Sequence, residues 1–346
     1  MLKTKPSQSS VIRNSITYLF FVILSCTLIV MATLKPVGFD NDSINYENAL
    51  TSFQDGSSSI SEPTFIVFSW LDGVFFDSNI HGLFFMYAFI SILINMFAIY
   101  KYSEVRLFSL IVYVCLYFIL HNLTQIRVGA AAAMFLLAIP DLISKNKTRY
   151  LLKILLACMF HFSSIILIPL VFLNNNRLNA KLFVAAPFTV LCFILIAGDM
   201  YSLLISIFSL FPAPIGPKAV NYILNLQLYG RFDNVNIFSK ITLCTLFFFL
   251  IYAISLIRKS TPNESDVIYF KLMSIMLTVF YLLSSVPVLA SRSFELLGIS
   301  LIFSLPALSL KFKQKKLAGL VIILWCFLYF YIVNLKLLNF EMLGLF

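Results

Sequence analysis

Residues 125–173 read QIRVGAAAAMFLLAIPDLISKNKTRYLLKILLACMFHFSSIILIPLVFL, and the interpretation of the whole chain depends on them. Arg127 opens one apolar run, and His161 interrupts a second run that begins after the basic turn at 145–149. Ionisable side chains are costly within a membrane and usually have a function there. This stretch therefore predicts membrane segments that carry part of a functional site.

The composition predicts a protein that is embedded in a membrane along its whole length. Of its 346 residues, 60% are hydrophobic and only 12% are charged, whereas a soluble domain has about 25% charged residues. Apolar stretches near the bilayer-spanning length of roughly 20 residues recur from end to end. We predict an all-α, polytopic membrane protein with a single transmembrane domain, 1–346, and about 10–12 transmembrane helices.

The segment 150–173 is predicted to form a hairpin of two short arms, because this choice gives the better distribution of positive charge. With a cytoplasmic N-terminus, the hairpin puts 18 of the 25 basic residues on the cytoplasmic side, as the positive-inside rule favours. A single span would instead turn the cluster at 311–316 outward. The hairpin gives about eleven membrane passes, a periplasmic C-terminus and an apex at His161 within an outward-facing cavity. The basic charge then needs no nucleic acid.

Two extracytoplasmic loops are predicted, at about 35–80 and 199–240. Three arginines are predicted to lie near the membrane boundary on the same, outer side. Arg127 begins a helix, whose N-terminus favours anions. Arg292 lies between two later spans on the same face, and the pair suggests a clamp for a pyrophosphate, since guanidinium binds such oxygens bidentately. Arg231 in the second loop is a weaker third candidate. For each arginine, the alternative is an ordinary interfacial or solvated charge.

Further polar candidates lie in the first loop and at the hairpin apex. Asp40, Asp42 and Tyr46 are side-chain types that hydrogen-bond sugar hydroxyls, although a solvated loop is the simpler explanation. His161 could orient a hydroxyl or a phosphate, or act as a base. His121, at the end of a span, is expected to be interfacial. The six cysteines lie in apolar runs without ligand spacing, so neither a metal nor another cofactor is expected.

The order of these features resembles the EpsG / Wzy-type family of polysaccharide polymerases. The similar features are Asp42 to Tyr46, then Glu62-Pro63, then Ile126-Arg127 before small residues, then Phe160-His161-Phe162-Ser163-Ser164, and finally Arg292. The chain departs from the family pattern at Val128-Gly129, where a polar residue and then a bulkier one are expected after Arg127. It also departs at Ser164, where alanine is usual, and at Phe294, where a tyrosine is expected.

The resemblance implies a GT-C-like membrane glycosyltransferase in the bacterial inner membrane. It would join undecaprenyl-pyrophosphate-linked oligosaccharide repeat units of O-antigen or exopolysaccharide on the periplasmic face, without a metal. Arg127, Arg292 and Arg231 would bind pyrophosphate, and Asp40, Asp42 and Tyr46 would bind sugar. His161 or Glu62 is the preferred base, with Asp40 and Asp42 left open. Membrane lipids, a chain-length regulator and a flippase are the expected partners.

Three other functions remain open on the sequence. A flippase or transporter for the same lipid-linked sugar would be expected to have charges in mid-span and repeated halves, and neither is found. An O-antigen ligase shares the arginine chemistry but typically has one large outer loop. An O-acyltransferase would need a cytoplasmic acyl donor, and the cytoplasmic turns here are short.

Overall fold

The computed structural model describes residues 8–40, 42–57, 60, 62–175, 179–198, 200–213, 215–229, 235–258 and 262–340. Within these ranges the protein is all-α, as predicted: it has no strand, only a single bridge between Asp40 and Leu338. Eight helical segments there are long and apolar enough to cross a membrane, or nine when one bent pair counts as a span. The polytopic class is thus confirmed.

The spanning segments are distributed along the whole described chain. They are α1 (Gln8–Thr33), α4 (Ile80–Tyr102), α5 with η1 (Arg106–Tyr113, Val114–Thr124), α6 (Ile126–Ile143), α8 (Ala180–Ala197), α11 (Lys240–Ile257), α12 (Glu264–Leu282), and α15 with η3 and η4 (Lys315–Tyr329, Phe330–Asn334, Leu335–Leu337). The bent pair is α13 (Pro287–Gly298) and α14 (Leu301–Ser309), at 56°. In the described chain, the predicted number of about eleven is reached only when the two arms of the hairpin, which are shorter than a span, are counted with these nine segments.

The hairpin consists of α7 (Lys147–Phe160) and the 3-10 helix η2 (Phe162–Phe172), joined at His161. The Tyr150 hydroxyl, near the start of α7, donates to the Leu167 carbonyl at 2.7 Å. Near the end of the return arm, Asn175 donates to the carbonyl of Ile143, the last residue of α6. Both ends of the hairpin therefore lie together at one end of the bundle, and His161 lies at the other.

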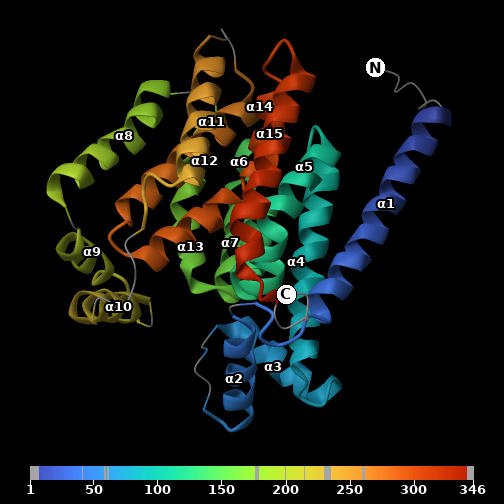
Figure 1. The fold of residues 1–346 in the computed structure, drawn as a ribbon, viewed down its shortest axis with the longest axis vertical. Coiled ribbons are helices and arrows are strands. Elements are labelled where there is room, and N and C mark those ends of the chain that lie inside the picture. Colours follow the sequence, from blue (N-terminus) through green and yellow to red (C-terminus); the bar gives the residue numbers. More distant parts are fainter. Residues whose placement is uncertain are drawn as a thin grey trace.

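Helices also form where the sequence suggested polar loops. The first loop contains α2 (Ser43–Gln54) and α3 (Pro63–Phe75), which project from one end of the bundle (Figure 1). The second contains α9 (Tyr201–Phe208) and α10 (Ile215–Tyr229), which lie below α8 at the left edge of Figure 1. Proline starts α3, a position where its missing N–H costs nothing. We call the end that carries α2 and α3 the site end.

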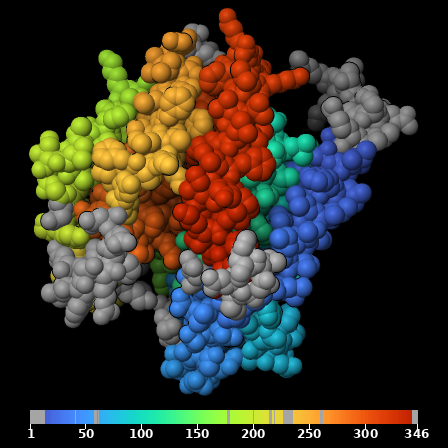
Figure 2. All heavy atoms as spheres, viewed as in Figure 1, coloured from blue at the N-terminus to red at the C-terminus, as the bar shows by residue number. Residues whose placement is uncertain are grey.

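The centre of the bundle is packed around α6. This helix contacts α4, α7 and η1, and its alanines at 130–133 are fully buried, which allows its neighbours to approach closely. α1 packs on α4 at the periphery and leaves many apolar side chains exposed, as a lipid-facing helix does. The space-filling view shows α15 over the middle of the bundle and α2 and α3 protruding below it (Figure 2).

Candidate functional site

Glu62 joins three elements at the site end. It precedes Pro63, and the residue before a proline is restricted to extended backbone; Glu62 indeed has φ −68° and ψ 131°. Its side chain meets Arg127 of α6, with 2.8 Å between Oε2 and Nη1. It also meets His161 at the hairpin apex, with 3.1 Å between Oε1 and Nδ1. One carboxylate thus brings together residues separated by up to 99 positions in sequence.

Arg127 is held in place by a tight turn between two spans. Gln125 alone separates η1 from α6, and its N–H donates to the Leu120 carbonyl. Gly129 makes this approach possible, because a Cβ there would lie 1.8 Å from the His121 carbonyl oxygen. The guanidinium lies 5.6 Å from the ring centroid of Tyr46, on α2. Arg127 is therefore fixed at a helix N-terminus, with one face on an aromatic ring.

His161 lies in an extended residue between the two arms, with φ −155° and ψ 122°. The Thr64 hydroxyl donates to the Met159 carbonyl at 2.9 Å, so the start of α3 is hydrogen-bonded to the end of α7, next to the apex. Phe160 packs edge-on against Phe68, with ring centroids 6.2 Å apart. When Nδ1 donates to Glu62, the imidazole keeps Nε2 as an acceptor. This is the tautomer that a general base needs.

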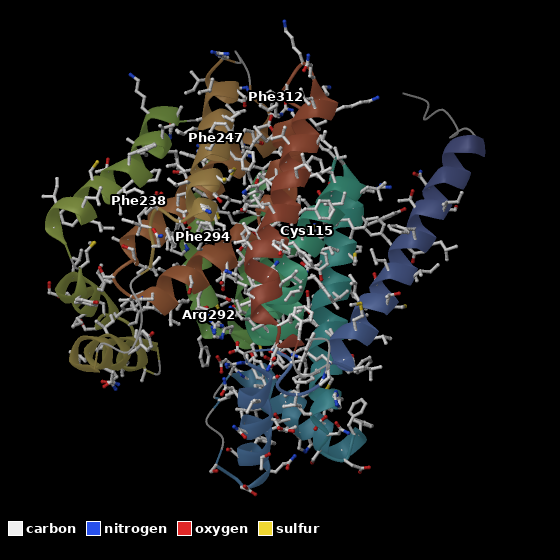
Figure 3. All side chains as sticks on the ribbon, viewed as in Figure 1. Cys115, Phe238, Phe247, Arg292, Phe294 and Phe312 are labelled. Atoms are coloured by element: carbon white, nitrogen blue, oxygen red, sulfur yellow. The ribbon has the colours of Figure 1, made fainter. Side chains whose placement is uncertain are left out.

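Arg292 of α13 lies at the same end, and Figure 3 shows it on the part of α13 that faces α2. Its Nη2 is 3.8 Å from Oδ2 of Asp42, a long ion pair between partly exposed side chains. Asp42 precedes α2, but its carboxylate does not cap that helix. The charges of Arg127 and Arg292 both act on Asp42, Tyr46 and His161. The two arginines predicted as a clamp therefore share one site.

Asp40 and Tyr46, predicted to bind sugar, are almost completely buried. Asp40 pairs with Lys35 at 2.7 Å through Oδ2, and its Oδ1 accepts the N–H groups of Asp42 and Ser43. Lys35 also donates to the Leu123 carbonyl at the end of η1. In this geometry Asp40 holds Asp42 in place, and Tyr46 supports Arg127. Their contact with sugar stays a prediction.

The other predictions for the site concern Arg231, a metal and the base. Arg231 lies outside the described residues. No cluster of three potential metal ligands from His, Cys, Asp and Glu occurs in the described part of the chain. Glu62 and His161, the two preferred bases, prove to be direct partners, which the sequence could not show because they come from different elements.

The charges around Glu62 change its ionisation. Burial alone would raise its pKa, but the hydrogen bond with His161 and the Arg127 charge outweigh burial and hold the pKa below its usual value. Burial raises the pKa of Asp42, with the nearby Arg292 charge opposing the shift. For His161, at the apex between the arms, burial lowers the pKa more than Glu62 raises it. At neutral pH the site therefore holds an ionised Glu62 and a neutral His161.

A second polar group near Arg292, the side chain of Glu295, was not predicted from the sequence. Glu295 follows it by three positions on α13, and its Oε2 is buried with no hydrogen-bond partner among the described residues. His121, expected at the interface, is instead fully buried and stacks on Tyr117 with ring centroids 5.4 Å apart. The π-helical winding of η1 accompanies this burial. Glu295 could have been noticed, because it is an acid three positions after Arg292, which the sequence analysis places between two spans.

Comparison with known proteins identifies the family. Residues 18–343 match the EpsG family, which is nearly the whole chain. The chain belongs to the EpsG family. Among curated proteins, the amylovoran biosynthesis protein AmsC of Erwinia amylovora is 27% identical over 172 residues. That match covers 46% of this chain and 45% of the relative. No solved structure matches.

Proposed function

We propose that this EpsG-family protein is a polysaccharide polymerase that joins undecaprenyl-pyrophosphate-linked oligosaccharide repeat units on the periplasmic face of the bacterial inner membrane. The convergence of Glu62, Arg127, His161 and Arg292 at the site end carries the proposal. It supplies a base and two cations, the groups that glycosyl transfer from a pyrophosphate requires. The relative AmsC, named for amylovoran biosynthesis, supports a role in polysaccharide assembly.

In the proposed reaction, a sugar hydroxyl of the incoming unit attacks the anomeric carbon of the growing glycan. The hydroxyl proton passes to Nε2 of His161, while Glu62 holds the imidazole through Nδ1. The bond between the anomeric carbon and the pyrophosphate oxygen breaks, and undecaprenyl pyrophosphate leaves with the electron pair. Arg127 and Arg292 stabilise the negative charge that develops on this leaving group. Asp42 releases Arg292 readily, because their ion pair is long.

Deletion of the gene in its host tests the proposal, with the surface glycan resolved on a gel. A polymerase defect leaves single repeat units on their acceptor and no ladder, and the wild-type gene restores the ladder. Loss of a flippase or a ligase leaves no repeat unit on the surface. Loss of an acyltransferase leaves the ladder length unchanged. Either of these last patterns would refute polymerisation as the function.

Complementation with single variants then tests the site. Arg127→Ala and Arg292→Ala should each abolish the ladder while the protein still inserts in the membrane, which immunoblotting of the membrane fraction checks. Arg→Lys at either position should restore it only in part, because a point charge replaces a bidentate fork. Lys313→Ala, which removes an exposed charge far from Glu62 in sequence, is the matched control. A full-length ladder in both alanine variants would exclude the two-arginine clamp.

A further inference from the structure

A polar cavity lies at the base of the hairpin, at the opposite end of the bundle from Glu62. Its volume is about 270 Å³, which is room for several water molecules. It is formed where α6 ends, α7 begins and η2 ends. The residues around it are Asp141, Leu142, Lys145, Lys147, Tyr150, Val171, Phe172, Leu173, Asn174 and Asn175. The proposed reaction uses none of them.

Positive charge exceeds negative charge around this cavity. Its single lining carboxylate, Asp141, is already paired with Lys153 at 2.5 Å. Lys145 also meets Glu264, at 3.9 Å, and both of these side chains are half exposed. The buried Lys271 donates to the carbonyl of Asn174, one of the residues that line the cavity. In the described chain, Lys271 has no carboxylate within ion-pair distance. An anion in the cavity would offset these charges.

Asn175 supplies a second and independent sign of a ligand. The residue is 1% exposed, and its Nδ2 donates to the Ile143 carbonyl. Its Oδ1 is buried and has no partner among the described residues. Buried acceptors nearly always have a hydrogen-bond partner. We therefore expect a ligand to supply a donor, such as a hydroxyl, to this oxygen. Lys145 has a left-handed backbone with φ +60°, and such strain is often found at binding sites.

The cavity opens beside an apolar surface. Phe172, at its edge, is 77% exposed, and the Lys147 ammonium lies 5.7 Å from the Phe172 ring centroid. Leu152, Leu155 and Leu156 of α7 are also about half exposed. A ligand with its charged part in the cavity can therefore lay hydrocarbon chains along α7, which a soluble phosphate compound cannot do.

We propose that this cavity binds the headgroup of an anionic phospholipid that carries free hydroxyls, with phosphatidylglycerol as the matching chemistry. Its phosphate would lie between Lys145 and Lys147, and a glycerol hydroxyl would donate to Oδ1 of Asn175. Basic pockets between membrane helices bind anionic headgroups in this manner. The bound lipid would brace the base of the hairpin, whose apex carries His161. This inference is independent of the reaction proposed above.

Native mass spectrometry of the full-length protein in detergent tests the proposal, with phosphatidylglycerol, phosphatidylmethanol and phosphatidylcholine of identical chains. Phosphatidylglycerol should bind most tightly. Each lysine near a headgroup is expected to contribute about fivefold in affinity. Lys147→Ala should therefore weaken binding about fivefold, and the Lys145→Ala, Lys147→Ala double variant about 25-fold. Lys313→Ala removes an exposed charge elsewhere and should change nothing.

Two further comparisons separate the ligand groups. Phosphatidylmethanol has the same charge but no hydroxyl, so it should bind several-fold more weakly than phosphatidylglycerol, and Asn175→Leu should remove this difference. Lys147→Arg keeps the charge and should keep the affinity, which controls for folding. Unchanged affinity for phosphatidylglycerol in the double lysine variant would overturn the proposal. Displacement of the lipid by millimolar glycerol phosphate would overturn it as well, because it would indicate a soluble ligand.

Discussion

Glu62 has two partners with different consequences. Its hydrogen bond with Nδ1 of His161 selects an imidazole tautomer, and its ion pair with Arg127 fixes a cation beside that ring. A carboxylate between two such groups is stabilised in its charged form, although burial opposes this. Removing only its charge should therefore affect the imidazole and the guanidinium together.

We expect Glu62→Gln to lower the rate of polymerisation about 10²-fold or more, the lower part of the range for general-base assistance. In the wild type, the rate should fall as acid protonates His161, at a pH below the ordinary histidine value because burial lowers this pKa. Glu62 raises the same pKa, so Glu62→Gln should move the acidic limb to still lower pH. The measurement is the pH profile of ladder formation by purified protein with lipid-linked repeat units.

Glu47→Gln is the matched control, because Glu47 is an exposed acid on the neighbouring helix α2. It should leave both the rate and the pH profile unchanged. An acidic limb that stays in place in Glu62→Gln would show that a group other than His161 titrates. An unchanged rate would remove Glu62 from the proposed mechanism.

Among the helices, η1 and α6 pack against each other at very short distance. These two segments reverse direction across Gln125, and Gly129 lies against the backbone of His121. This approach places Arg127 at the site and buries His121. The close packing of these two segments therefore determines where the Arg127 charge lies.

Gly129→Ala should push η1 and α6 apart, because the added Cβ would lie 1.8 Å from a backbone oxygen that cannot move alone. Overpacking of this kind typically costs about 1–3 kcal/mol. We expect a lower melting temperature in detergent and a weaker ladder in cells. In Gly319→Ala, on α15, the new Cβ would meet only Phe108 at 3.6 Å, so stability should be kept. Equal melting temperatures in the two variants would contradict the close contact.

At the scale of the whole molecule, the sequence predicted the spans better than their contacts. The helix α6 begins beside Arg127, where the sequence analysis places the start of an apolar run, because hydrophobic length and charge determine where a helix crosses lipid. The Lys35–Asp40 pair, the burial of His121 and the link between Glu62 and His161 could not be predicted. They depend on the packing of segments distant in sequence, which periodicity does not encode. The helices α2, α9 and α10 were not predicted, because each has 15 residues or fewer and short segments carry a weak helical pattern.

The hairpin determines how every later segment is oriented, so its topology is the last prediction. Lys147 and Lys181, on either side of the hairpin, are exposed, and so is Ser57 in the segment after α2. The base contacts of Tyr150 and Asn175 require both flanks at one end of the bundle. In a cysteine-free background, Lys147→Cys and Lys181→Cys should resist a membrane-impermeant thiol reagent in intact spheroplasts and react after lysis. Ser57→Cys should react in both.

Reaction of Lys181→Cys in intact spheroplasts, with Lys147→Cys protected, would make 150–173 a single span. His161 would then lie within that span and not at a hairpin apex. Protection of both lysine positions would place the basic residues around the base cavity on the cytoplasmic side, where the positive-inside rule puts them.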